Sequence, residues 1–205
     1  AAQKKLELKN DIETISLIQK AYSAAKVMND IINDLLSISR FRLGKVKGRF
    51  AFINATSLCD ELVKENLPAA HKKSLSLKSI STSPVEIYAD QGLLSEAVRN
   101  LISNSIKFCR PNDSISVCVS SNEDGIEIQV QDTGPGLTPA QVEKINSTGR
   151  IDSTDGSLGE KGTGLGLLLT RDIMDLHGGR IQVTSTQHKG AQFKLLLPKF
   201  SNEVS

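Results

Sequence analysis

Hydrophobic positions recur every three or four residues over 5–43, and no glycine or proline falls among them. This spacing places them on one face and predicts a single long helix. The positions on that face are Leu8, Ile12, Ile15, Tyr22, Ala25, Met28, Ile32, Leu35 and Ser39. Globular domains seldom contain so long a helix, so we expect a partner helix or a second chain to cover its apolar stripe.

The pattern changes at Gly44 and Gly48, and we expect the segment LGKVKG to be a hinge to a compact domain. Beyond it, stretches of alternating hydrophobicity are mixed with stretches of helical periodicity. Strands are expected at 49–55, 74–80, 84–89, 114–121, 125–132, 180–185 and 191–198. Helices are expected at 56–73, at 91–109, near 138–146 and, after a glycine-rich segment, up to Leu176.

Local signals refine these elements. Thr56 or Ser57 is expected to cap the first helix of the compact domain, and Asp90 the second. The turn NEDG predicts a hairpin between two alternating strands, and the last two strands predict a second one. Helices interleaved with hairpins predict a two-layer α/β sandwich with a mostly antiparallel mixed sheet, preceded by the long N-terminal helix.

The length of 205 residues fits one domain with an appendage. We expect a helical segment at 1–44, a compact domain at 45–200 and a tail at 201–205. A formal net charge of +2, with aromatic residues at 4%, gives no electrostatic or base-stacking case for a nucleic-acid partner.

The three cysteines, Cys59, Cys109 and Cys118, are odd in number and widely spaced, so we expect reduced, buried thiols in the cytoplasm. No apolar run approaches membrane-spanning length, and the start AAQKKLELKN has no apolar signal core. The expectation is therefore a soluble, cytoplasmic chain without a membrane segment, which leaves open an anchor elsewhere in a longer protein.

Candidate chemistry begins on the helix that follows Asp90. Asn100, Asn104 and Lys107 share one strip of that helix beside its apolar face. An asparagine offers a neutral oxygen to magnesium, which takes many of its other ligands from phosphate and water, and a nearby lysine neutralises phosphate charge. A solvated helix flank is the alternative interpretation of this strip.

The segment GEKGTGLGLLLT places Gly159, Gly162, Gly164 and Gly166 before and at the start of a helix. Glycines let backbone approach an anion, and the amides at a helix start favour phosphate. The segment is neither a Walker loop nor a dinucleotide fingerprint, and a flexible linker remains the alternative.

The segment DTGPGL places Asp132 directly after an alternating strand. A carboxylate is unsuited to face a phosphate, but it can accept a hydrogen bond from an exocyclic amine such as that of adenine. We expect Asp132 to bind the base, with Gly134 and Gly136 letting the loop approach the purine. The asparagine and lysine strip would then serve the phosphates through magnesium, and the later glycines would form a lid.

Together NLISNSIKF, DTGPGL and GEKGTGLGLLLTRDIMDLHGGRIQV resemble the N box and the two glycine boxes of the catalytic ATP-binding domain of sensor histidine kinases. The wider group includes gyrase, the heat-shock chaperone ATPases and the mismatch-repair ATPases. The resemblance spans about 50–198 and implies ATP between the helical layer and a mobile lid. It also implies that Asn104 is the magnesium ligand. The implied ATP-binding residues are Asn100, Asn104, Lys107, Asp132, Gly134, Gly136, Lys161, Gly162, Thr163, Gly164, Leu165 and Gly166.

The segment MNDIINDLLSISRFRLGKV is similar to the second helix of the dimerisation and phosphotransfer hairpin of these kinases, which implies a homodimer through the N-terminal helices. His71, His177 and His188 all lack the flanking residues of the family's phosphoacceptor box, and we interpret each as structural. No catalytic residue is identified, so the acceptor histidine is expected upstream of this chain or is absent from the protein.

The resemblance implies transfer of the γ-phosphoryl group of ATP to a histidine, for relay to a response regulator or receiver domain. Asn100 stands where related hydrolases have a water-activating glutamate, which favours a kinase over an ATPase. The segment between the glycine boxes, TPAQVEKINSTGRIDSTDGS, has no phenylalanine, whereas many family members carry one there. The alternatives are a pseudokinase-like regulatory module, an ATP-binding protein without autophosphorylation, and an ATP hydrolase or serine kinase of the same group.

Overall fold

The computed structural model describes residues 47–148, Ser157 and 164–199, together with scattered residues between 14 and 39. Its main sheet has five strands in the order β2–β4–β5–β7–β6. The β2 and β4 strands pair in parallel, and the other neighbours pair antiparallel. The bounds are β2 Ser76–Ser79, β4 Ser114–Asn122, β5 Gly125–Asp132, β7 Ala191–Leu197 and β6 Arg180–Ser185. A separate two-stranded sheet pairs β1 (Phe50–Asn54) with β3 (Glu86–Asp90).

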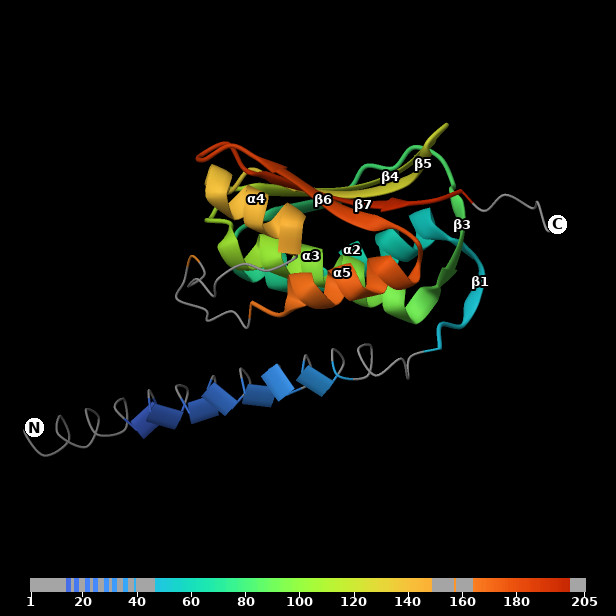
Figure 1. The fold of residues 1–205 in the computed structure, drawn as a ribbon. Helices are drawn as coiled ribbons and strands as arrows, with labels where there is room; N and C mark the ends of the chain where they lie inside the picture. The colour runs from blue at the N-terminus through green and yellow to red at the C-terminus, as the bar shows by residue number, and fades with distance from the viewer. Residues whose placement is uncertain are drawn as a thin grey trace, which may run out of the picture.

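Helices form the second layer against one face of the main sheet (Figure 1). This layer contains α2 (Ala55–Lys72), α3 (Gln91–Phe108) and α5 (Gly166–Leu176), while α4 (Pro139–Thr148) lies beside β6. The predicted α/β sandwich with a mostly antiparallel sheet is therefore confirmed, as are both hairpins.

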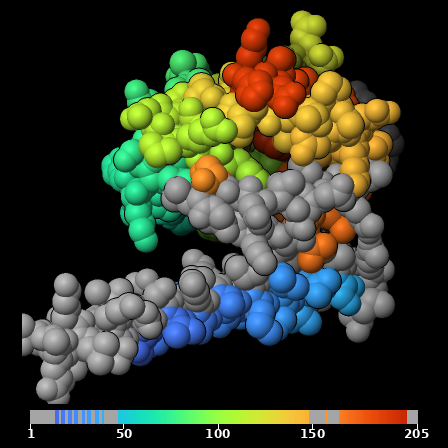
Figure 2. Space-filling view, turned by 90° about the vertical axis from the view of Figure 1, so that its left-hand side faces the viewer, coloured from blue at the N-terminus to red at the C-terminus, as the bar shows by residue number. Residues whose placement is uncertain are grey.

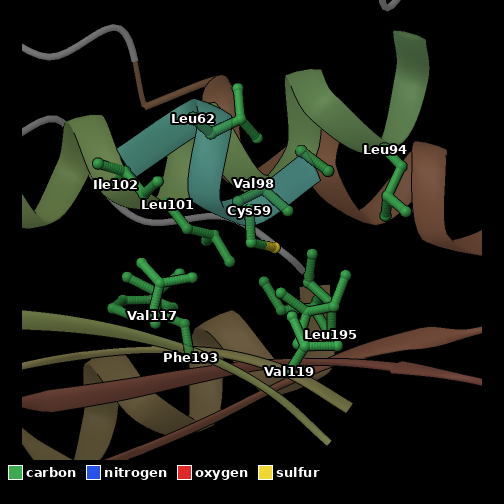
Figure 3. Close-up of a cluster of buried hydrophobic side chains, with 14 of the residues drawn as sticks. Cys59, Leu62, Leu94, Val98, Leu101, Ile102, Val117, Val119, Phe193 and Leu195 are labelled. Carbon is green, nitrogen blue, oxygen red and sulfur yellow. The ribbon is translucent and has the colours of Figure 1, made fainter. Parts of the chain in front are cut away.

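The core forms where the two layers meet. On α3 the buried positions follow helical spacing, and on β4 and β7 they alternate, as the two geometries require. Figure 3 shows Cys59 and Leu101 extending from the helices toward the sheet side chains Val117, Val119, Phe193 and Leu195. Leu62, Leu94, Val98 and Ile102 of the helix layer belong to the same buried cluster. Each large side chain buried this way contributes about 1.5–3 kcal/mol to folding.

The residue that caps α2 differs from the prediction. The cap of α2 is Asn54, whose side chain accepts a hydrogen bond from the Ser57 amide at 2.8 Å, so the expectation of Thr56 or Ser57 is wrong. Thr56 instead donates its hydroxyl to the Ser83 carbonyl at 3.0 Å. Asp90 caps α3 as expected, since its Oδ1 accepts from the Leu93 amide at 3.0 Å.

The scattered described residues between 14 and 39 are helical, in agreement with the predicted long helix. Their large apolar side chains are exposed: Ile15, Leu17, Ile18, Tyr22, Met28, Ile32, Leu35 and Leu36. The proposed hinge lies mostly outside the described residues. None of the helices in the described part of the chain has the length and apolarity needed to cross a membrane.

The three cysteines are free thiols. Cys59 and Cys109 are buried, as predicted. The expectation is wrong for Cys118, which is only partly buried. The reason is the alternation of β4, which points Val117 and Val119 into the core and turns the residue between them to the other face.

Candidate functional site

The predicted strip on α3 forms because an 18-residue helix brings positions three and four apart onto one side. Asn100, Asn104 and Lys107 are all partly buried there, next to the fully buried apolar stripe. Ser105 belongs to that buried stripe and is only 2% exposed. The helix therefore presents two amides and an ammonium group at its rim, and one hydroxyl toward the end of β5.

Asp132 ends β5 and is 8% exposed. Its Oδ1 accepts hydrogen bonds from the backbone amides of Gly134 at 2.9 Å and Ala191 at 3.2 Å. Its Oδ2 accepts from the Ser105 hydroxyl at 3.3 Å. Burial is the largest influence on this carboxyl and raises its pKa above the ordinary value. The hydrogen bonds oppose that rise, and the nearby carboxylate of Asp113 adds to it.

The loop after Asp132 has little room for side chains. A Cβ on Gly134 would lie 3.1 Å from both Asp132 Oδ1 and Cys109 Sγ. Gly136 has a φ of +67°, and a Cβ there would collide with the carbonyl oxygen of Thr186. The two glycines therefore differ: Gly134 lies at the carboxylate, whereas the close contact of Gly136 is with protein backbone.

The turn between β6 and β7 holds this loop in place. His188 donates its amide to the Pro135 carbonyl at 2.7 Å, and Leu137 donates its amide to the Ser185 hydroxyl at 2.8 Å. Figure 2 shows this end of the molecule, where the red turn lies beside the gold helix α4. Three segments far apart in the sequence thus meet around Asp132, namely the end of α3, the loop after β5 and the start of β7.

The start of α5 packs against α3. Asn100 Nδ2 donates to the Gly166 carbonyl at 3.4 Å, and a Cβ on Gly166 would lie 3.3 Å from Asn100 Oδ1. Gly164 has a φ of +69°, which favours glycine before the helix begins. No side chain in the described part of the chain caps the first turn of α5. Its leading amides can therefore serve an anion.

The end of α3 is also held by other segments. Buried Lys73 donates its ammonium to the carbonyls of Ile106 at 2.9 Å and Lys107 at 2.6 Å. Ser157, from the glycine-rich segment, donates its amide to the Lys107 carbonyl at 3.1 Å and its hydroxyl to the Cys109 carbonyl at 2.6 Å. The Nζ of Lys107 lies 4.9 Å from the centre of the Phe108 ring.

Two pairs of predicted residues are thus in contact, Asn100 with Gly166 and Asp132 with Gly134. Gly164 lies just before α5. Gly136 lies in the same loop as Gly134. Leu165 immediately precedes α5 and packs partly against the core. The remaining predicted residues Lys161, Gly162 and Thr163 lie outside the described residues.

Sequence reasoning missed two contributors to the site, Ser105 and the amide of Ala191. Ser105 carried a usable signal, because a hydroxyl at position 105 continues the buried stripe through Val98, Leu101 and Ile102. The amide of Ala191 carried none, since its place is set by the pairing of β7 with β5.

His177 has a structural role, as expected. Its Nδ1 lies 2.8 Å from the Ile173 carbonyl, and its Nε2 accepts from the Asp90 amide at 3.1 Å. It also lines a cavity of about 490 Å³ with Phe50, Tyr88, Leu176, Gly178, Pro198 and Lys199. Among the described residues, those that line this cavity include no carboxylate and none of the predicted site residues.

The chain is similar to known proteins in both sequence and fold. Residues 89–201 match the model of the family described as histidine kinase-, DNA gyrase B- and HSP90-like ATPase. Hybrid signal transduction histidine kinase D of Dictyostelium discoideum is 34% identical over 87% of this chain and 12% of that protein. Sensor histidine kinase GacS of Pseudomonas protegens is 32% identical over 85% of this chain and 20% of that protein.

A solved structure of full-length ShkA in complex with AMPPNP superimposes with a TM-score of 0.73 at 26% identity, covering 82% of this chain and 35% of that one. The chain spans only a small part of these relatives. The match covers the segment that carries α3, Asp132 and α5. The chain therefore belongs to the family of histidine kinase-, DNA gyrase B- and HSP90-like ATPases, and its domain is the ATP-binding catalytic domain of a sensor histidine kinase.

Proposed function

We propose that this domain binds magnesium and ATP, with Asp132 at the adenine and the α3 strip at the phosphates, and supplies the γ-phosphoryl group to a histidine outside the described residues. The observation that carries the proposal is the environment of Asp132. A buried carboxylate costs free energy unless it has partners, and this one is held by a glycine loop, β7 and α3.

The choice of adenine as the base bound at Asp132 follows from hydrogen-bond chemistry. An ionised carboxylate only accepts, so it fits the exocyclic amine of adenine and opposes the carbonyl of a 6-oxo purine. Gly134 leaves the approach to Asp132 free of a side chain. These features support an adenine nucleotide as the ligand.

Magnesium fits the residues at the phosphate end. No group of three or more histidine, cysteine, aspartate or glutamate side chains that could hold a metal occurs in the described part of the chain. Magnesium usually takes most of its ligands from phosphate and water oxygens and needs few from the protein. Asn104 is partly buried on the α3 rim and would offer its amide oxygen. The ion would supply neutralisation of the triphosphate charge.

The identity of Asn100 supports phosphoryl transfer over hydrolysis. Asn100, one turn before Asn104, has an amide that cannot act as a base, and it contacts Gly166 at the start of α5. The domain would then act by positioning ATP and neutralising its charge, with Lys107 and the first amides of α5 at the phosphates. We extend the proposal to the parent protein as a histidine kinase that dimerises through its N-terminal helices and relays phosphate to a response regulator or receiver domain.

A regulatory module is the second candidate. It is favoured by the exposed apolar side chains between residues 15 and 36, which suit an interaction helix, and by the lack of a phosphoacceptor motif in the sequence. Nucleotide binding separates the two candidates, because a module acting only through its helix has no need of a competent ATP site.

The test compares Asp132→Asn with the unchanged chain, using ATP and inorganic triphosphate as ligands. The substitution keeps the size of the side chain but replaces one acceptor oxygen by a donor group. We expect ATP affinity to fall at least about tenfold while triphosphate affinity stays the same. An equal loss for both ligands would remove Asp132 from base recognition.

A further inference from the structure

Ser105 is the one side chain that hydrogen-bonds to Asp132 among the described residues. The other two partners of Asp132 are backbone amides. The contact is buried on both sides, with Ser105 2% and Asp132 8% exposed. A hydroxyl in such a place is not explained by solvation or by packing alone, because alanine would fill most of the same space.

The two carboxylate oxygens of Asp132 differ in their hydrogen-bond partners. Oδ1 accepts from two backbone amides, which is its full ordinary capacity. Oδ2 accepts from the Ser105 hydroxyl alone among the described residues, so it retains capacity for one further donor. A ligand amine is therefore directed to Oδ2, the oxygen that Ser105 touches.

Ser105 also connects the two ends of the site. It follows Asn104 directly on α3, whereas Asp132 ends β5, and the hydroxyl bridges these two elements at 3.3 Å. The oxygen that faces the base is thus tied to the helix that carries the phosphate-side groups. A change at Ser105 would alter the position of Oδ2 relative to Asn104.

We propose that Ser105 is a positioning residue for base selection, which holds Asp132 Oδ2 as a pure acceptor aimed at the 6-amino group of the purine and so favours 6-amino over 6-oxo nucleotides. The inference rests on the proposed function, because it takes Asp132 as the group that contacts the base. It adds a specificity determinant that lies behind that contact.

The electrostatics support this role. A hydroxyl that donates to the carboxylate favours its ionised form, and the Ser105 bond does lower the pKa of Asp132 against the effect of burial. Without that bond, a protonated Asp132 becomes easier to form and could donate to the carbonyl of a 6-oxo base. Nearby Cys109 does not replace the hydroxyl, because a thiol is only a weak hydrogen-bond donor.

The experiment measures the affinities of ADP and inosine diphosphate for the full 205-residue chain by calorimetry, in the unchanged protein and in Ser105→Ala, Ser105→Thr and Asp132→Asn. Exposed Ser103 lies on the same helix, and Ser103→Ala is the matched control. Thermal unfolding of every variant accompanies the titrations, so that a loss of fold is recognised.

We expect Ser105→Ala to weaken ADP about tenfold while inosine diphosphate changes less than about twofold, so that the preference for ADP shrinks. Ser105→Thr should restore most of the preference, and Ser103→Ala should leave it unchanged. An unchanged preference in a folded Ser105→Ala variant would overturn the role of Ser105, as would an equal loss of both ligands. Asp132→Asn separates this inference from the proposed function. If Asp132→Asn reduces the preference for ADP over inosine diphosphate while Ser105→Ala does not, the proposed function stands and the role of Ser105 is overturned. A chain that binds neither nucleotide would overturn both.

Discussion

The buried carboxyl of Asp132 costs stability when it is ionised. Burial raises its pKa above the ordinary value of about 3.9. The folded protein therefore holds this proton more tightly than the unfolded chain does. As pH rises from the ordinary value through the raised one, the carboxyl ionises inside the fold and its contribution to the free energy of unfolding falls.

Nucleotide binding should follow the opposite trend, because the exocyclic amine of adenine needs an ionised acceptor. We predict that ADP affinity rises with pH over the window between the ordinary and the raised pKa of Asp132, while the free energy of unfolding loses a contribution over the same window. Asp132→Asn should remove both dependences, as measured by calorimetric titration and urea unfolding at several pH values. Parallel pH profiles for the variant and the unchanged chain would contradict this account.

At the scale of elements, the helices and strands of the described domain follow from their hydrophobic periods. The predicted and observed bounds of α3, 91–109 and Gln91–Phe108, differ by one residue because both ends carry strong local signals. The cap of α2 was mispredicted because Asn54, Thr56 and Ser57 are all capping residue types, and only the backbone geometry selects among them. Strand order was not predictable locally, since β7 inserts between β5 and β6 through long-range pairing.

The loop after β5 gives an element-level prediction. Gly136 has a φ of +67° and faces the Thr186 carbonyl, so Gly136→Ala adds both strain and a collision. We expect it to lower the free energy of unfolding by about 1–3 kcal/mol and to weaken ATP binding, because the loop also holds Gly134. Gly92→Ala is the control, since its Cβ would have only Asp90 Oδ1 nearby, at 3.4 Å, and a helical alanine costs nothing. Equal stability of the two variants in urea unfolding would contradict the interpretation.

At the scale of the whole molecule, the candidate site draws its groups from segments that lie far apart in the sequence. The α3 helix brings amides and an ammonium group, β5 brings the carboxylate, β7 brings an amide to hold it, and α5 brings a helix start that no described side chain caps. The order of the three sequence motifs was enough to expect an ATP site. The contacts of Ser105 and Ala191 with Asp132 could not be expected, because they depend on how α3 and β7 pack around the end of β5.

The most direct test of the account is a calorimetric titration of the 205-residue chain with a non-hydrolysable ATP analogue, with and without magnesium. The account predicts binding that is at least about tenfold tighter with magnesium, and an Asn104→Ala variant that loses this enhancement. No binding at millimolar analogue would contradict the ATP site and would make the regulatory module the leading explanation of this chain.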